Sequence, residues 1–244
     1  NDSLYTITLN CLDKAIELDY MNHRAYGRRG LLNLTNKYFD KAIVDYSKFI
    51  SMTEDSIEIF KGLTDRGIAK IYNGDLKGAI ADYEQAIHYN PNDASIYINL
   101  GGIYIDGGNY QKANEVLGKG HKIFPRNKGI LNNLGFLNIK LENYKKAKRF
   151  FNESINVNDN DFLAYGNRGY CNLKLKKLDK ARNDLDKSIK LNPNNSYVYM
   201  YNACYYIETG ISNEICKNLE EANNLGFSKM YGNRVNELIT KHCN

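Results

Sequence analysis

Residues 94–127 read ASIYINLGGIYIDGGNYQKANEVLGKGHKIFPRN, and this stretch decides the fold because its internal order returns along the chain. Gly101 is followed twelve residues later by Ala113, and four residues after that by the large apolar Leu117. The glycines that begin this order are separated by 37, 34, 34 and 34 residues: Gly30, Gly67, Gly101, Gly135 and Gly169. Five consecutive copies at so regular a spacing indicate one structural unit repeated along the chain.

Each unit carries the periodicity of a pair of helices. In residues 76–87, apolar side chains recur at spacings of three and four, as they do on one face of an α-helix. The two halves of that unit are joined by Asn73-Gly74-Asp75, where glycine permits positive φ and Asp caps the second helix. The recurrent glycine and alanine are explained by close approach of the two helices. The sequence therefore predicts antiparallel helix pairs, about fourteen helices in all, and no strand.

This repeated unit resembles the tetratricopeptide repeat, whose pattern is W-x2-L-G-x2-Y, then A-x3-F, then P. The best copy matches that pattern at Tyr97, Leu100, Gly101, Tyr104, Ala113, Leu117 and Pro125. Tyrosine or leucine stands in the tryptophan position, since the chain contains no tryptophan. The resemblance implies an all-α fold, a right-handed α-solenoid of antiparallel helix pairs, that acts as a non-catalytic scaffold for protein interaction.

The repeat register divides the chain into eight segments. These are a partial repeat with only its second helix at 1–22, five repeats at 23–59, 60–93, 94–127, 128–161 and 162–195, a degenerate repeat at 196–227, and a capping helix at 228–244. The 37-residue spacing is expected to lengthen the helix that contains Tyr46 by about one turn. Because the first segment begins in mid-repeat and without Met, we expect that residues precede Asn1 in the whole protein, a signal peptide or a catalytic domain among the possibilities.

Composition and motifs exclude several function classes. The formal net charge of +5 is too mild to predict a nucleic-acid partner, and no apolar run is long enough to cross a bilayer. No phosphate-binding glycine loop, H-E-x-x-H or C-x-x-C motif occurs, and the four histidines do not pair. We therefore expect no catalytic residue, no metal site and no cofactor.

In tetratricopeptide arrays the first helix of each unit lines a concave groove that contacts the ligand. Carried onto residues 128–227, the resemblance implies an aromatic and amide-rich groove suited to an extended peptide or a helix. Its expected residues are Asn132, Asn133, Phe136, Ile139, Lys140, Gly166, Asn167, Tyr170, Leu173, Lys174, Tyr197, Met200, Tyr201 and Ile207.

Tyr170 and Tyr201 are expected at the centre of this groove, with Asn133 and Asn167 beside them. On that hypothesis, Tyr170→Ala and Asn167→Ala weaken binding without changing the melting temperature. The alternative is that the apolar groove residues only pack helix against helix, and we expect this for about half of Phe136, Ile139, Tyr170 and Leu173.

Other partners are weighed from charge and register. A chaperone-tail clamp needs Lys and Asn where the first repeat has Gly27 and Leu31, so this type of recognition is not expected. Residues 140–190 contain thirteen Lys or Arg against seven Asp or Glu. As an alternative, this basic surface binds an anionic partner, either nucleic acid or phospholipid. A further alternative is that the chain regulates or targets an enzyme whose catalytic domain lies upstream.

Two of the five cysteines stand apart. Cys11, Cys171 and Cys204 lie on apolar helix positions, where cysteine is usually a small buried hydrophobe. Cys216 and Cys243 lie at the ends of the last two expected helices and are expected to have Cα atoms under about 7 Å apart. The final thirty or so residues also resemble the closing segment of tetratricopeptide proteins from Bacteroidetes-type bacteria, many of them exported. A disulfide or two free thiols are both open, and an exported location is favoured over a cytoplasmic one.

Overall fold

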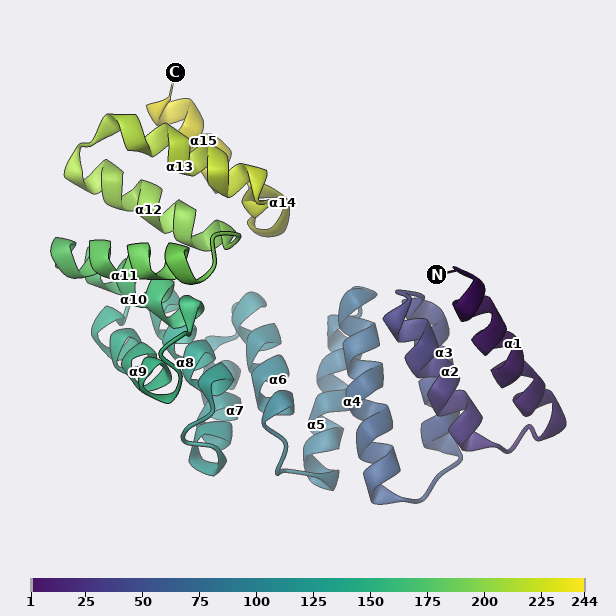
Figure 1. Ribbon diagram of the computed structural model, residues 1–244. Coiled ribbons are helices and arrows are strands. Elements are labelled where there is room, and N and C mark those ends of the chain that lie inside the picture. The colour runs from purple at the N-terminus through teal and green to yellow at the C-terminus, as the bar shows by residue number, and fades with distance from the viewer. Residues whose placement is uncertain (1, 244) are drawn as a thin grey trace. The chain divides into compact units, whose positions relative to one another are not determined.

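The computed structural model describes residues 2–243, and within them the chain forms fifteen α-helices and no strand (Figure 1). The helices are α1 (Asp2–Leu18), α2 (His23–Thr35), α3 (Phe39–Ser51), α4 (Ser56–Tyr72), α5 (Leu76–Tyr89), α6 (Ala94–Asp106), α7 (Tyr110–Ile123), α8 (Lys128–Lys140), α9 (Tyr144–Val157), α10 (Phe162–Lys174), α11 (Leu178–Leu191), α12 (Ser196–Thr209), α13 (Ser212–Asn224), α14 (Phe227–Tyr231) and α15 (Arg234–His242). The all-α prediction is confirmed.

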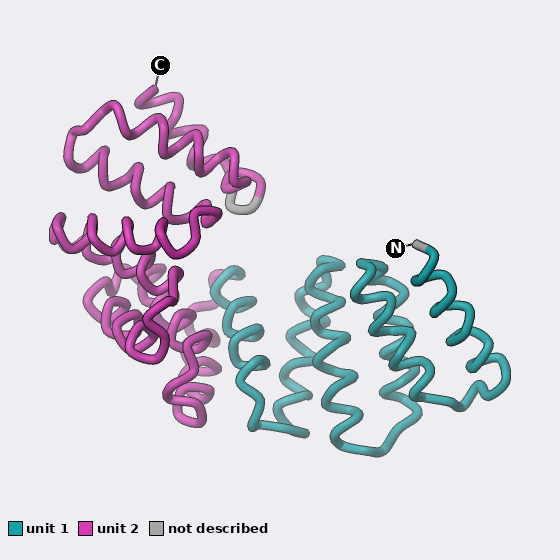
Figure 2. Tube along the Cα trace, viewed as in Figure 1, with its two compact units in different colours: residues 1–107 teal, residues 108–244 magenta. Residues whose placement is uncertain are grey.

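The chain divides into two compact units, residues 1–107 and 108–244 (Figure 2). The division falls at the turn between α6 and α7, which are the two helices of the expected third repeat. In the first unit, α2 packs on α3 and α4 on α5; in the second, the same pairing joins α8 with α9, α10 with α11, and α12 with α13. Successive pairs also contact one another within each unit, so each unit is a stack of antiparallel helix pairs (Figure 1).

The recurrent glycines are contact points inside the pairs. A Cβ atom added at Gly135 would lie 2.5 Å from the ring of Phe151, and one added at Gly67 would lie 3.1 Å from the ring of Tyr83. Phe151 and Tyr83 are fully buried. The large apolar residue sixteen positions later also packs onto Gly30 and Gly169, so close approach explains the small residue at these four positions.

The extra residues of the 37-residue spacing lengthen a different helix from the one expected. α3, which contains Tyr46, ends at Ser51, whereas α4 has 17 residues against 13 in α2 and α6. The side chain of Asp55 accepts hydrogen bonds from the backbone N–H groups of Ile57 and Glu58, and the Thr53 hydroxyl donates to Glu58 at 2.7 Å. This N-terminal cap allows α4 to begin one turn earlier, so the prediction of a longer α3 was wrong.

The C-terminal cap consists of two short helices in place of the single helix expected. Gly232 separates α14 from α15 with a φ of 86°, a value that favours glycine. Phe227 and Val235 from these helices are buried against Met200 and Leu219 of the last repeat. A disulfide joins Cys216 in α13 to Cys243 after α15, with Cα atoms 5.6 Å apart. No helix among the described residues is long and apolar enough to cross a membrane.

Candidate functional site

A pocket of about 280 Å³ lies in the second unit, where the first helices of the last repeats meet the C-terminal cap. Seven of the expected groove residues line it: Phe136, Ile139, Lys140, Tyr170, Tyr197, Met200 and Tyr201. They come from α8, α10 and α12, which are the first helices of three successive repeats. We call this the groove pocket.

Aromatic residues make up half of its lining, six of twelve. The rings of Tyr170 and Tyr201 stack with centroids 4.4 Å apart and planes inclined by 22°. Tyr144 meets Tyr170 edge to face at 6.3 Å, and Phe136 meets Tyr197 in the same way at 6.5 Å. Stacked and edge-to-face rings at these separations hold one another in fixed orientations. The pocket therefore has a rigid aromatic wall.

Cationic side chains surround the rings. The Lys140 ammonium lies 5.0 Å from the centroid of the Phe136 ring, and that of Lys174 lies 5.5 Å from the Tyr170 ring. Arg234 of α15 lines the pocket together with a single carboxylate, Glu142. Burial raises the pKa of Tyr170, and the nearby Arg234 guanidinium acts in the opposite direction. The rim thus presents more positive than negative charge.

Several expected groove residues do not line this pocket. Asn132 donates to Asp161 at 2.8 Å, and Asn167 accepts a hydrogen bond from the Tyr201 hydroxyl at 3.2 Å. Asn133 lies half-buried on α8, outside the pocket lining. Gly166 is buried close to Ser188. The amides described by these contacts stabilise the repeat rather than face an open pocket.

Burial also separates the aromatic and aliphatic groove residues. Ile139, Tyr170 and Leu173 are buried in the helical core, and Phe136 is half-buried. Three of these four residues are therefore buried between helices, whereas about half were expected to be. This burial also argues against the expectation that Tyr170→Ala leaves stability unchanged, because removing a buried ring leaves a cavity.

Five further lining residues were missed by sequence reasoning: Glu142, Tyr144, Cys204, Phe227 and Arg234. Phe227 and Arg234 belong to α14 and α15, which lie outside the repeat pattern, so no register predicts where they face. Tyr144 begins the second helix of its repeat, and the groove register covers only first helices. The cap supplies one ring and one cation to the pocket, and no signal in the sequence alone indicates this.

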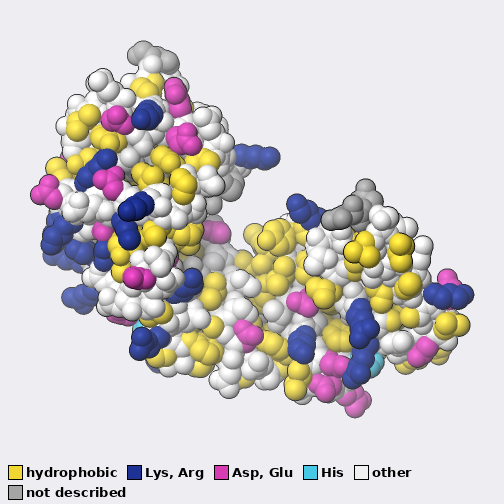
Figure 3. Space-filling view, in the orientation of Figure 1, with side chains coloured by type: hydrophobic (Ala, Val, Ile, Leu, Met, Phe, Trp, Pro, Cys, Tyr) yellow, Lys and Arg dark blue, Asp and Glu magenta, His cyan; other side chains and the backbone are white. Residues whose placement is uncertain are grey.

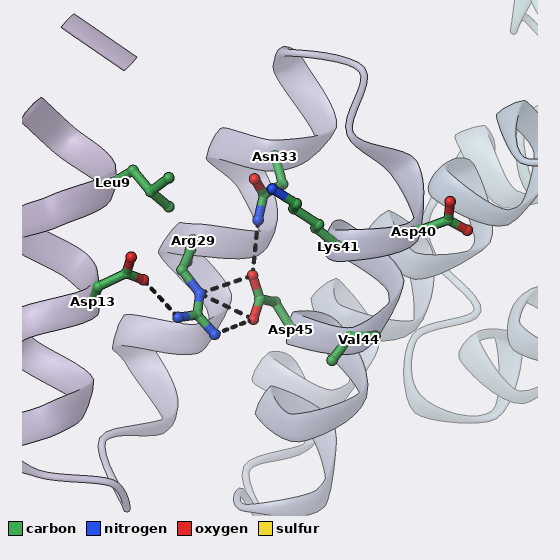
Figure 4. Close-up of a pocket in the computed structure, with 8 residues that line it drawn as sticks. All are labelled: Leu9, Asp13, Arg29, Asn33, Asp40, Lys41, Val44 and Asp45. Atoms are coloured by element: carbon green, nitrogen blue, oxygen red, sulfur yellow. Dashed lines mark hydrogen bonds and ion pairs between the residues drawn. The ribbon is translucent and has the colours of Figure 1, made fainter. Parts of the chain in front are cut away.

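A second recurrent feature is a buried polar cluster built around an arginine. Arg29, Arg66 and Arg168 stand directly before the repeat glycine, and each pairs with the aspartate sixteen residues later. In the first unit, Arg29 donates to Asp45 and Asp13, and the Asn33 amide donates to Asp45 at 2.9 Å (Figure 4). One arginine thus joins α1, α2 and α3.

The matched spacing of sixteen is a sequence signal that was overlooked. Where the fourth repeat has Leu134 before its glycine, the position sixteen residues later is Phe150, and in the sixth repeat the pair is Asn202 and Asn218, hydrogen-bonded at 2.8 Å. The residue before the repeat glycine and the residue sixteen positions after it therefore match in type. An arginine faces an aspartate, an apolar residue is matched with an apolar residue, and an amide is hydrogen-bonded to an amide. Among residues 2–243, no group of His, Cys, Asp and Glu could hold a metal ion.

Comparison with known proteins finds models of one repeat family along the chain. Models of the tetratricopeptide repeat match residues 23–56, 94–127 and 129–161, and further models of the same repeat match residues 67–104 and 162–195. The chain belongs to the tetratricopeptide repeat family.

Individual relatives are distant. Tetratricopeptide repeat protein 6 of Homo sapiens is 29% identical over 116 residues, which are 47% of this chain and 21% of that protein. The chain therefore spans about a fifth of the length of this relative. Photosystem I assembly protein Ycf3 of Prochlorococcus marinus is 24% identical over 140 residues, which are 51% of this chain and 81% of that protein.

The fold has close likenesses among solved structures. A tetratricopeptide repeat protein from Parabacteroides merdae superposes with a TM-score of 0.76 at 18% identity, over 97% of this chain and 91% of that chain. At this identity the likeness describes the fold alone, a helical repeat array.

Proposed function

We propose that this protein is a non-catalytic scaffold that binds a peptide segment of a partner protein in the groove pocket. The observation that carries the proposal is the meeting of seven expected groove residues at one pocket with an aromatic wall. A recognition pocket needs rigid apolar surface that a ligand side chain can cover, and the Tyr170 and Tyr201 stack supplies it. The distant similarity to an assembly protein, Ycf3, fits a scaffold role.

The charges around the pocket specify the chemistry of the segment. Lys140 and Arg234 line the pocket and Lys174 lies against its Tyr170 wall, whereas Glu142 is the single lining carboxylate. A complementary ligand carries negative charge, because like charges placed together would oppose binding. The proposed segment therefore places an Asp or Glu beside a large apolar or aromatic residue, with the apolar side chain against the rings and the carboxylate toward the cations.

Selection from a displayed library of random peptides tests this proposal. With the native protein as bait, enriched peptides should share an aromatic or large aliphatic residue next to Asp or Glu. With the variant Lys140→Glu/Arg234→Glu, the acidic residue should disappear from the enriched peptides or be replaced by Lys or Arg. Both substituted side chains are exposed, so the fold is expected to survive the change.

Lys145→Glu/Lys146→Glu provides the matched control, since these exposed lysines lie on α9 and do not line the groove pocket. This variant should enrich the same peptides as the native protein. Enrichment of the same acidic peptides by Lys140→Glu/Arg234→Glu would contradict the proposal. Loss of selection only in the Lys145→Glu/Lys146→Glu variant would assign binding instead to the basic face of α9, which carries Lys145 and Lys146.

A further inference from the structure

A second pocket in the same unit, of about 380 Å³, surrounds the Arg168 cluster. Lys148 and Asn152 of α9, Arg168 and Asn172 of α10, and Lys180 and Asp184 of α11 line it. Arg168 is held by Asp184 through two hydrogen bonds of 2.9 and 2.6 Å and donates a third to Asn152 at 2.9 Å. Figure 3 shows Lys and Arg side chains gathered at the edge of this unit, beside α9 and α11 as labelled in Figure 1.

The buried side chain of Asn172 has an oxygen atom that accepts no hydrogen bond. Its amide nitrogen donates to Asp184 at 2.9 Å, and this fixes the orientation of the amide because a carboxylate only accepts. The Oδ1 atom is buried without a hydrogen-bond partner, and the whole side chain is 2% exposed. A buried acceptor left unpaired is costly. Asn172 therefore offers an acceptor that a donor on a bound molecule would satisfy.

The equivalent cluster in the first unit is complete. Asn33 makes the same bond to Asp45, and its Oδ1 atom accepts from the Tyr5 hydroxyl at 3.1 Å. Tyr144 stands in the place of Tyr5, but its ring is turned to Tyr170 and lines the groove pocket. The tyrosine that donates to the asparagine in the first cluster therefore has a counterpart, Tyr144, that lines the groove pocket in the second unit instead.

Charge distinguishes the two clusters as well. Around Arg29 the pocket, of about 390 Å³, is lined by two cationic side chains and three aspartates (Figure 4). Around Arg168 it is lined by three cationic side chains and one aspartate. Lys148 and Asn152 stand where the first cluster has Leu9 and Asp13, and Asp179, the counterpart of Asp40, does not line the second pocket. The pocket around Arg168 is therefore more positively charged than the pocket around Arg29, although the two are built from equivalent helices.

The lysines in and beside this pocket, unlike Arg168, make no salt bridge with another described residue. None of the salt bridges within residues 2–243 includes Lys148, Lys177 or Lys180. Burial lowers the pKa of Lys148, and the cations of Lys177, Lys180 and Arg168 lower it further. Lysines arranged against one another in this way are stabilised by a bound anion.

We infer that this pocket binds a small phosphate, as free hydrogen phosphate or as the phosphate of a small hydroxylated metabolite. The anionic oxygens face Lys148 and Lys180, and one hydroxyl hydrogen of the ligand is donated to Asn172 Oδ1. Sulfate has the same shape and the same charge as the hydrogen phosphate dianion, but it has no hydroxyl hydrogen to donate. The site should therefore prefer phosphate to sulfate. The inference is independent of the groove pocket, which lies on other side chains.

Isothermal titration calorimetry at mildly alkaline pH and constant ionic strength tests the inference, with sodium phosphate, glycerol phosphate and sodium sulfate as titrants. Phosphate should bind with one site per chain and more tightly than sulfate. The variant Lys148→Leu/Asn152→Asp, which copies Leu9 and Asp13 of the first cluster, should weaken phosphate binding about tenfold or more, because charge-assisted hydrogen bonds are lost. Lys148→Gln serves as the milder variant should the double variant be unstable.

The matched control is Lys41→Gln, since Lys41 occupies in the first cluster the place of Lys180 in the second. It should leave phosphate binding unchanged. Equal dissociation constants for sulfate and phosphate would overturn the role of Asn172. Phosphate binding that persists in both Lys148 variants, or that is lost on Lys41→Gln, would overturn the site.

Discussion

Tyr170 and Tyr201 stack with ring centroids 4.4 Å apart, and this contact joins α10 to α12, the first helices of two successive repeats. Both rings are buried to more than nine-tenths, and both still line the groove pocket. The same pair therefore holds two repeats together and forms the wall of the proposed peptide site. The stability of any Tyr170 or Tyr201 variant must therefore be measured before a change in its binding is interpreted.

The first prediction separates ring from hydroxyl at this contact. Tyr170→Ala removes a buried ring and should lower the free energy of unfolding by about 3–5 kcal/mol. Tyr201→Phe keeps the stack and loses only the hydrogen bond to Asn167, at a cost of about 0.5–1.5 kcal/mol. Urea unfolding followed by circular dichroism measures both. A Tyr170→Ala variant as stable as the native protein would show that the ring is not part of the core.

The second prediction concerns the Arg168 and Asp184 pair. Arg168→Leu removes the salt bridge of the buried Asp184 and leaves the Asn172 amide as its hydrogen-bond donor, and should cost about 3–5 kcal/mol. Arg168→Leu/Asp184→Phe copies the Leu134 and Phe150 of the fourth repeat and should recover most of that loss. A double-mutant cycle in urea measures the coupling. Equal losses for the single and double variants would mean that the matched pairs are coincidental.

The third prediction tests the packing of the repeat glycine. Gly135→Ala places a Cβ atom 2.5 Å from the Phe151 ring and should destabilise the second unit by roughly 1–3 kcal/mol. Gly118→Ala in α7 is the matched control, because nothing lies within 4 Å of the added methyl group. Alanine in a helix is favoured over glycine by roughly 0.5–1 kcal/mol, so the control should be stabilised. Melting temperatures that change in the same direction would contradict the packing.

The repeat determined how far sequence reasoning could reach. The Gly135 and Phe151 contact follows from a spacing that recurs in every full repeat, so the helix pairs and the groove helices could be predicted from the sequence. Phe227 and Arg234 could not, because the cap occurs once and has no register to place it. The longer α4 was missed for a similar reason, since the cap at Asp55 is a local hydrogen-bond arrangement that the count of residues does not reveal.

The fourth prediction uses thiol reactivity. With the Cys216 and Cys243 disulfide formed, the unfolded protein without reductant should titrate three thiols instead of five. In the folded protein, burial raises the pKa of Cys171 to about 12, so this thiol should resist alkylation at neutral pH while the exposed Cys11 reacts. Mass spectrometry after alkylation counts both. Five titratable thiols would remove the argument for an oxidising, exported location.

The central claim is that the groove pocket, and not the basic face of α9, binds the partner segment. Fluorescence anisotropy with one peptide enriched on the native protein tests it most directly. Phe136→Ala should weaken binding by about 2 kcal/mol, a fall of roughly thirtyfold in affinity, because a half-buried aromatic wall is lost. Lys145→Glu/Lys146→Glu should leave the dissociation constant unchanged. Normal binding by Phe136→Ala, together with loss of binding at low salt in the lysine variant, would contradict the account.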